Sequence, residues 1–236
     1  MIGEGGIGEL DSRGAGAAGT SGAYGAARRL VNCTLLALLL LATHPALAAT
    51  RILMLGDSIT AGYGLAPEDA LPARLEHRLR ADGFDAAVIN GGVSGDTTAG
   101  GLARLGWALG DKPRYALVAL GANDALRGLD PQAAYDNLDK ILTQLAGQGV
   151  KALLVGMRAP TNWGRDYETR FDAIYPKLAA EHHVPLYPFL LDGVALDPKL
   201  NQADGLHPNP AGVAVIVQRL APAVEALLRG GAAQAG

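Results

Sequence analysis

The chain has 236 residues, of which 49% are hydrophobic and 18% are charged. This composition is typical of a globular protein and excludes a wholly disordered chain, and the length predicts one domain. Twenty basic and 23 acidic side chains give a net charge of −3. Because the basic residues form no long run, we expect no nucleic-acid partner. The single cysteine, Cys33, excludes a disulfide within the chain and a multi-cysteine zinc site.

The first 48 residues differ in composition from the rest. Residues 1–27 are rich in glycine without apolar periodicity, and we interpret them as a disordered extension or as the product of a start assigned too far upstream. A basic pair at 28–29, an apolar run at 30–41 and small residues at 46–48 follow in the order of an export signal. The run is shorter than the roughly 20 residues that span a bilayer. We therefore expect cleavage after Ala48, a periplasmic or secreted protein, and no stable membrane span in the mature chain.

Short apolar runs alternate with helix-period segments in the rest of the chain. This pattern predicts one α/β domain over residues 49–230, a flavodoxin-like three-layer sandwich whose five-stranded parallel sheet carries helices on both faces. The expected strands are 51–56, 86–90, 115–121, 152–156 and 184–188. The expected helices are 67–82, 97–109, 131–147, 167–182 and 210–228. Residues 231–236 are expected to form a flexible tail.

Polar residues and glycines follow the ends of the expected strands. Residues 56–58 follow the first strand, residues 92–96 the second, residues 121–124 the third, and residues 204–207 lie in a loop after the fifth. In open parallel sheets, ligands bind outside the carboxyl ends of the strands. The four segments therefore predict one site at this edge of the sheet.

Asp204 and His207 have the spacing of a carboxylate that orients an imidazole. Within a turn, the acid can hold Nδ1–H and leave Nε2 free to take a proton from a hydroxyl group. Ser58 is the candidate hydroxyl, although a serine in this position is by itself more often a helix N-cap. The three residue types together favour acyl transfer with Ser58 as the nucleophile.

Acyl transfer also requires hydrogen-bond donors for the oxygen that becomes negative. The candidates are the N–H groups of Ser58 and Gly95 and the side-chain amide of Asn123. Gly95 precedes an expected helix, so its N–H lies at the positive helix end and no side chain blocks a substrate. These donors predict an oxyanion hole.

Aspartates at the same edge could be interpreted as a metal site formed by Asp57, Asp124 and Asp204. Their spacing follows loop turns, in which aspartate usually accepts hydrogen bonds from nearby backbone amides. We therefore expect no metal and no cofactor.

Four blocks of the sequence resemble those of the GDSL, or SGNH, hydrolases. Residues 56–60 (GDSIT) resemble the first block, and Gly95, residues 121–124 (GAND) and the Asp204-x-x-His207 motif resemble the others in the same order. Residues 94–105 (SGDTTAGGLARL) and 174–178 (IYPKL) are similar to the bacterial periplasmic branch that includes acyl-CoA thioesterase, lysophospholipase and arylesterase activities. The resemblance spans about residues 51–228.

This resemblance implies a role for each matching residue. Ser58 would be the nucleophile, His207 the general base and then acid, and Asp204 its orienting carboxylate, with Gly95 and Asn123 completing the oxyanion hole. The implied substrates are small acyl esters or thioesters, with lysophospholipids among them. Ala122 stands where this branch often has a second glycine, which would narrow the pocket slightly.

Residues after the third and fourth strands are the candidates for contact with the substrate. Leu126, Met157, Pro160 and Trp163 are expected to line an acyl groove, although packing in the core is the ordinary role of a tryptophan. Arg127 and Arg158 would either meet a phosphate group or remain solvated.

Three functions remain open at this point. The favoured one is a hydrolase of carboxylic esters and thioesters. A carbohydrate O-deacetylase of the same family is the first alternative, and a shallow polar pocket would favour it. A non-catalytic flavodoxin-like binding module is the second, and it would make the catalytic set accidental.

Overall fold

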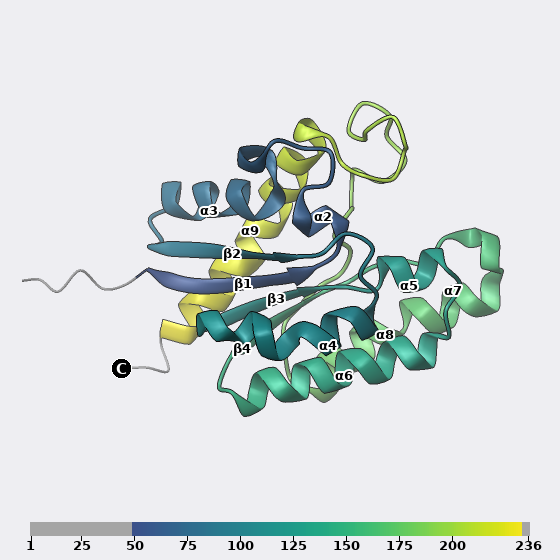
Figure 1. Cartoon of the computed structure of the whole chain (residues 1–236), viewed down its shortest axis with the longest axis horizontal. Helices are drawn as coiled ribbons and strands as arrows, with labels where there is room; N and C mark the ends of the chain where they lie inside the picture. Colours follow the sequence, from purple (N-terminus) through teal and green to yellow (C-terminus); the bar gives the residue numbers. More distant parts are fainter. Residues whose placement is uncertain (1–48, 233–236) are drawn as a thin grey trace, which may run out of the picture. The chain divides into compact units, whose positions relative to one another are not determined.

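A five-stranded parallel sheet forms the centre of the computed structural model, which describes residues 49–232 (Figure 1). The strands are β1 (Thr50–Gly56), β2 (Ala86–Gly92), β3 (Tyr115–Ala119), β4 (Lys151–Val155) and β5 (Leu186–Tyr187). Their order in the sheet is β2-β1-β3-β4-β5, and every pairing is parallel. The predicted sheet is confirmed in its number of strands and in their direction.

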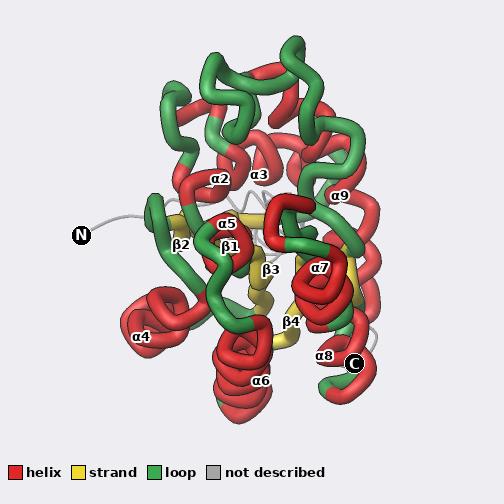
Figure 2. Tube along the Cα trace, turned by 90° about the vertical axis from the view of Figure 1, so that its right-hand side faces the viewer, coloured by secondary structure: helices red, strands yellow, loops and turns green. Residues whose placement is uncertain are grey.

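Helices cover both faces of the sheet (Figures 1 and 2). The helices α3 (Leu71–Ala81) and α9 (Pro210–Ala232) pack together on one face, and α4 (Thr98–Ala108), α6 (Pro131–Gly147) and α8 (Ile174–Glu181) lie on the other. The central residues of β1, Ile52–Leu55, are at most 1% exposed. Such continuous apolar strands suit a sheet that is covered on both sides. The three-layer sandwich is therefore confirmed.

Several short helices complete the fold. They are α2 (Ser58–Ala61), α5 (Ala122–Leu126), α7 (Arg165–Asp172) and the 3-10 helices η1 (Pro67–Asp69), η2 (Leu109–Asp111) and η3 (Thr161–Trp163). The helices α2 and α5 follow β1 and β3 directly, and both were missed because four or five residues show no apolar periodicity.

Prolines account for the largest differences from the predicted elements. Residues 167–182 form two helices rather than one, because Pro176 has no N–H to donate to the carbonyl of Asp172. The fifth strand has two residues rather than five, since Pro185 and Pro188 flank it and neither can donate a ladder hydrogen bond. The helix predicted from Pro67 begins only at Leu71, after η1.

The C-terminal helix α9 is the one helix among residues 49–232 that is long and apolar enough to cross a membrane. Its buried residues recur at helical spacing on one side and include Val213, Ile216, Leu220 and Val224. That stripe packs toward the sheet and α3, so α9 is a helix of the core. It continues to Ala232, beyond the predicted end.

Two predicted segments and most of a third fall outside the described part of the chain. They are the glycine-rich extension at 1–27 and the export signal at 28–48, together with residues 233–236 of the predicted tail. Cleavage after Ala48 therefore stays a prediction.

The end of β2 packs closely against α2, the helix that carries Ser58. A Cβ atom at Gly92 would lie 2.2 Å from the Ala61 nitrogen and 2.7 Å from its Cα. These are backbone atoms, which cannot rotate away as a flexible side chain can. A residue without a side chain is therefore required at position 92 for α2 to rest on the sheet.

We predict that Gly92→Ala lowers the free energy of unfolding by about 1–3 kcal/mol, as overpacking of a well-packed site usually does. Gly106→Ala is the matched control, because Gly106 lies on the exposed side of α4 and its Cβ would meet nothing within 4 Å. That control should be more stable than wild type by about 0.5–1 kcal/mol. Urea unfolding measures both, and wild-type stability in Gly92→Ala would contradict the close packing.

Candidate active site

Ser58 lies at the carboxyl end of the central strand β1. The chain turns at Asp57, which caps α2 by accepting a hydrogen bond from the Ile59 N–H at 3.1 Å. Ser58 is the first residue of this helix and is half-buried. Figure 2 looks onto this edge of the sheet, where α5 lies in front of the strand ends and α2 lies above them in the view. The sheet and the cap thus hold the serine in a defined position.

His207 and Asp204 reach this serine from the loop between β5 and α9. The distance from Ser58 Oγ to His207 Nε2 is 2.9 Å, and from His207 Nδ1 to Asp204 Oδ2 it is 2.7 Å. Because a carboxylate can only accept, Nδ1 carries the proton and the neutral ring offers Nε2 to the serine hydroxyl. The structure therefore brings the three residues together in the order that the sequence predicted.

Hydrogen bonds keep the Asp204 carboxylate ionised. Its Oδ1 accepts from the backbone N–H groups of His207 at 3.0 Å and Leu206 at 2.9 Å. The bond from the His207 N–H, the His207 ring and the Leu206 N–H together lower the pKa of Asp204 to about 2. The positive φ of Gly205, 69°, allows the turn in which these bonds form. Asp204 can therefore hold the imidazole at any ordinary pH.

Tyr63 and Gln202 support the histidine, and sequence reasoning missed both. The ring centroids of Tyr63 and His207 are 4.6 Å apart. Gln202 donates from Nε2 to the carbonyls of Tyr63 at 2.7 Å and Pro208 at 3.0 Å, and its backbone N–H donates to the His207 carbonyl. The only signal in the sequence was a tyrosine between two glycines shortly after the serine.

The three candidate oxyanion donors lie on the loops that follow β1, β2 and β3. Residues 93–96 form a turn closed by the Asp96 N–H and the Val93 carbonyl, and Gly95 has the positive φ, 84°, that this turn requires. Asn123 lies in α5, and its Nδ2 donates to the Asp96 carbonyl at 2.9 Å. One Nδ2–H remains for a ligand. The loops of Gly95 and Asn123 are thus joined directly.

Two other aspartates at this edge serve the backbone, as predicted. Asp57 caps α2, and Asp124 accepts from the Thr98 N–H at 2.8 Å and the Thr98 Oγ1 at 2.6 Å. Burial raises the pKa of Asp124 despite these bonds. In the part of the chain that the structure describes, no three His, Cys, Asp or Glu side chains gather as metal ligands.

The predicted groove residues differ in exposure. Leu126 and Trp163 are both 46% exposed, and Pro160 is half-buried. Met157 is only 3% exposed and belongs to the core, so an acyl chain could not contact its side chain without movement of the loop. Leu129, 41% exposed, lies three residues after Leu126, which ends α5. Among these five residues, Leu126, Leu129 and Trp163 therefore have the most accessible apolar side chains.

The two arginines considered as phosphate ligands have contacts within the protein. Arg127 donates from Nη2 to the Gly95 carbonyl at 2.9 Å. The Arg158 guanidinium lies 5.1 Å from the centre of the Phe189 ring. Arg127 thus supports the turn that presents Gly95, a role that its sequence position did not indicate.

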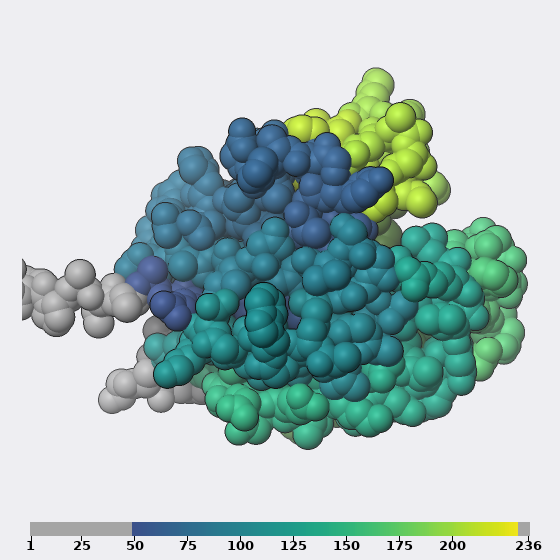
Figure 3. Space-filling model, viewed as in Figure 1, coloured from purple at the N-terminus to yellow at the C-terminus, as the bar shows by residue number. Residues whose placement is uncertain are grey.

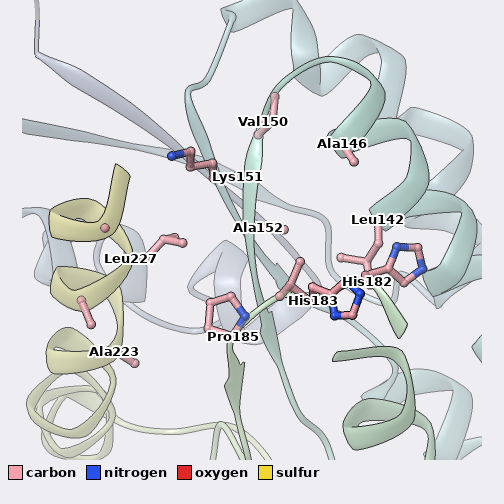
Figure 4. A pocket seen from close by; sticks show the side chains of 13 residues that line it. Leu142, Ala146, Val150, Lys151, Ala152, His182, His183, Pro185, Ala223 and Leu227 are labelled. Atoms are coloured by element: carbon pink, nitrogen blue, oxygen red, sulfur yellow. The ribbon is translucent and has the colours of Figure 1, made fainter. Parts of the chain in front are cut away.

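A cavity of about 480 Å³ lies at the opposite end of the sheet (Figure 4). Its walls come from the start of β4, the segment before β5 and the C-terminal ends of α6 and α9, and they include Lys151, His182 and Leu227. His182 already pairs with Asp139 at 2.8 Å. Since Ser58 lies at the carboxyl ends of the strands, this cavity is separate from the candidate site.

The chain is similar to known lipases, acylhydrolases and esterases. The profile of the GDSL-like lipase/acylhydrolase family matches residues 54–215. A thioesterase 1/protease 1/lysophospholipase L1 of Escherichia coli is 45% identical over 172 residues, which cover 72% of this chain and 81% of that protein. An arylesterase of Vibrio mimicus is 43% identical and covers 69% of this chain and 82% of its own length. The crystal structure of AlinE4, an SGNH-hydrolase family esterase, is 48% identical with a TM-score of 0.65 and covers 76% of this chain and 97% of its own.

The fold and the arrangement of Ser58, His207 and Asp204 define an α/β protein with a serine-histidine-aspartate site at the edge of a parallel sheet. The chain belongs to the GDSL-like lipase/acylhydrolase family.

We predict a pH-dependent effect of Asp57→Asn on stability. Burial raises the pKa of Asp57 to about 6, outweighing the lowering by the Ile59 N–H and by His207. Because the unfolded carboxyl ionises near pH 4, the folded protein loses stability as pH rises from about 4 to 6 and stays destabilised above that range. The asparagine, whose oxygen can still cap α2, should raise the free energy of unfolding by up to about 3 kcal/mol at pH 8. Near pH 4, urea unfolding should show the same free energy of unfolding for Asp57→Asn and wild type. An equal increase at pH 4 and pH 8 would show that the effect does not come from ionisation of Asp57.

Proposed function

We propose that the protein is a serine hydrolase of carboxylic esters and acyl thioesters. The observation that carries the proposal is the hydrogen-bonded series from Ser58 Oγ through His207 to Asp204, with distances of 2.9 and 2.7 Å. The similarity to proteins described as a thioesterase, a lysophospholipase and an arylesterase supports hydrolysis of ester and thioester bonds.

The first half of the reaction forms an acyl-enzyme. Ser58 Oγ attacks the carbonyl carbon while His207 Nε2 takes the hydroxyl proton, and the carbonyl electron pair moves onto oxygen. That oxyanion accepts hydrogen bonds from the Ser58 N–H, the Gly95 N–H and the Asn123 amide. When the tetrahedral intermediate collapses, the bond to the leaving group breaks and His207 returns the proton to the alcohol or thiol.

The second half repeats these steps with water. His207 removes a proton from the water as its oxygen attacks the acyl carbon. On collapse, the bond between that carbon and Ser58 Oγ breaks, His207 returns the proton to Oγ, and the carboxylic acid is released. The Asp204 carboxylate stabilises the imidazolium in both halves because it is ionised throughout the working pH range.

We propose that the protein selects its substrates by their acyl chains. The accessible Leu126, Leu129 and Trp163 offer an apolar wall, and Trp163 is braced against the backbone of Gly128, where a Cβ would lie 2.8 Å from the indole. Figure 3 shows the surface indented between the region before α9 and the region of α5 and α7. A lysophospholipid, which carries one acyl ester, fits this substrate class. The proposed location is the periplasm or the medium, because of the export signal predicted at residues 28–48.

Ser58→Ala and His207→Ala should each remove nearly all hydrolysis of p-nitrophenyl butyrate while thermal unfolding stays close to that of wild type. Both residues act on the reacting atoms, and neither side chain is fully buried. Labelling by a serine-directed phosphonate, followed by mass spectrometry, should find Ser58 modified in the wild type only. Turnover above about a few per cent of wild type in either variant would refute the triad.

The acyl-groove proposal predicts that butyrate to octanoate esters have a higher kcat/KM than acetate. Each methylene that is fully desolvated contributes about 0.8 kcal/mol, and an open groove realises part of this. Trp163→Ala should lower the ratio of octanoate to acetate hydrolysis. Trp107→Ala is the matched control, because Trp107 is 82% exposed and lies near the C-terminal end of α4. This variant should leave the ratio unchanged. A preference for acetate would instead favour the deacetylase.

A further inference from the structure

Arg104, on helix α4, contacts two of the segments that form the candidate site. Its Nε donates to Asp96 Oδ2 at 2.5 Å, and its Nη2 donates to the Gly56 carbonyl at 2.8 Å. Gly56 lies two residues before Ser58, and Asp96 directly follows Gly95. One guanidinium group therefore ties the end of β1 to the turn after β2.

The same group is linked to the third segment through Asp96. The Asp96 carbonyl accepts the hydrogen bond of Asn123 Nδ2 at 2.9 Å, while its carboxylate receives Arg104. Gly100 leaves room for that carboxylate, since a Cβ there would lie 2.6 Å from Asp96 Oδ1. All three candidate oxyanion donors are thus connected to Arg104 by one or two hydrogen bonds and a short length of backbone.

The environment of Arg104 strengthens these contacts. The side chains of Arg104 and Asp96 are 17% and 16% exposed, so water screens the ion pair only weakly. The remaining nitrogen, Nη1, is buried without a hydrogen-bond partner among the described residues. A buried unpaired donor is unfavourable, so packing alone gives no reason for an arginine at this position.

The chemistry of arginine suits this arrangement. Its planar guanidinium presents several N–H donors in fixed directions, so two acceptors on different segments are held at a fixed separation. A lysine would place one ammonium group at the end of a flexible chain and could not hold both acceptors in the same geometry.

We propose that Arg104 is a positioning residue that aligns the Ser58 N–H, the Gly95 N–H and the Asn123 amide on the oxygen of the tetrahedral intermediate. The inference rests on the proposed hydrolase function and adds a residue that does not itself touch the substrate. Because these donors act most strongly in the transition state, their misalignment lowers kcat and leaves KM largely unchanged.

The test compares Arg104→Met with Arg80→Met in steady-state hydrolysis of p-nitrophenyl butyrate. Arg80 is the matched control because it also pairs with a carboxylate, that of Glu76 at 3.0 Å, and donates to a strand carbonyl, that of Ala86 at 2.8 Å. Those contacts lie at the amino end of β2. Arg104→Met should lose about 10²-fold in kcat, the effect of a displacement of about 1 Å at the reacting groups. Arg80→Met should keep wild-type kcat, and loss of kcat in both variants alike would overturn the proposal.

A double variant separates positioning from a general structural effect. Asn123→Ala alone should lower kcat by about 10²–10³-fold. If Arg104 acts through the same donors, the loss in Arg104→Met/Asn123→Ala is smaller than the product of the two single losses. Inhibition by a trifluoromethyl ketone, whose serine adduct carries the oxyanion, should weaken in Arg104→Met in parallel with kcat.

The outcomes distinguish this inference from the proposed function. If the wild type shows no Ser58-dependent hydrolysis, the proposed function itself is refuted. Two outcomes with an active wild type would overturn only the role of Arg104. One is an Arg104→Met variant with wild-type kcat, and the other is a double variant whose loss equals the product of the two single losses. If Arg104→Met does not fold, Arg104→Lys replaces it, with a smaller loss of kcat expected and an unchanged kcat again overturning the proposal.

Discussion

The parallel register of β1 with its two neighbours places Gly56, Gly92 and Ala119 side by side. Three loops therefore leave the sheet at the same level, and each carries one of the candidate oxyanion donors within a few residues of the strand end. The candidate oxyanion hole is therefore assembled from three segments that are far apart in the sequence and adjacent in the sheet. The hydrogen bonds of Arg104, Asn123 and Arg127 join these loops to one another, so the sheet sets the level and the polar contacts set the fine geometry.

Two aspartates near the serine show how position decides the chemistry of one residue type. Asp204 is exposed and accepts three hydrogen bonds, and its pKa falls to about 2. Asp57 is 1% exposed, one of its oxygens has no partner among the described residues, and its pKa rises to about 6. The first is suited to hold a cationic imidazole, and the second is suited to cap a helix in an apolar setting. Desolvation outweighs hydrogen bonding only where water is excluded.

The apolar side chains around the site are divided between packing and the surface. Met157 and Phe171 are buried, whereas Leu126, Leu129 and Trp163 remain accessible at the same edge of the sheet. Trp163 rests on Gly128 and lies 6.4 Å from the ring of Tyr167, whose hydroxyl donates to the Leu129 carbonyl. Because these contacts already fix the Trp163 side chain, it would lose little conformational freedom when an acyl chain binds against it.

The sequence by itself determined the class of fold, the number of strands and the three residues that meet at the site. Apolar runs and helix periods report burial directly, and the Asp-x-x-His spacing is local enough for a turn to bring the two side chains together. It did not determine that residues 167–182 break into two helices, which depends on the missing N–H of Pro176. It did not determine that Met157 is buried, which depends on packing across the sheet. It also gave no sign of α2 and α5, because these helices are too short to show a period. The links made by Arg104, Arg127, Tyr63 and Gln202 were decided only by the tertiary structure. Each joins segments far apart in the chain, and no local pattern records a contact that forms only when the sheet has brought those segments to one edge.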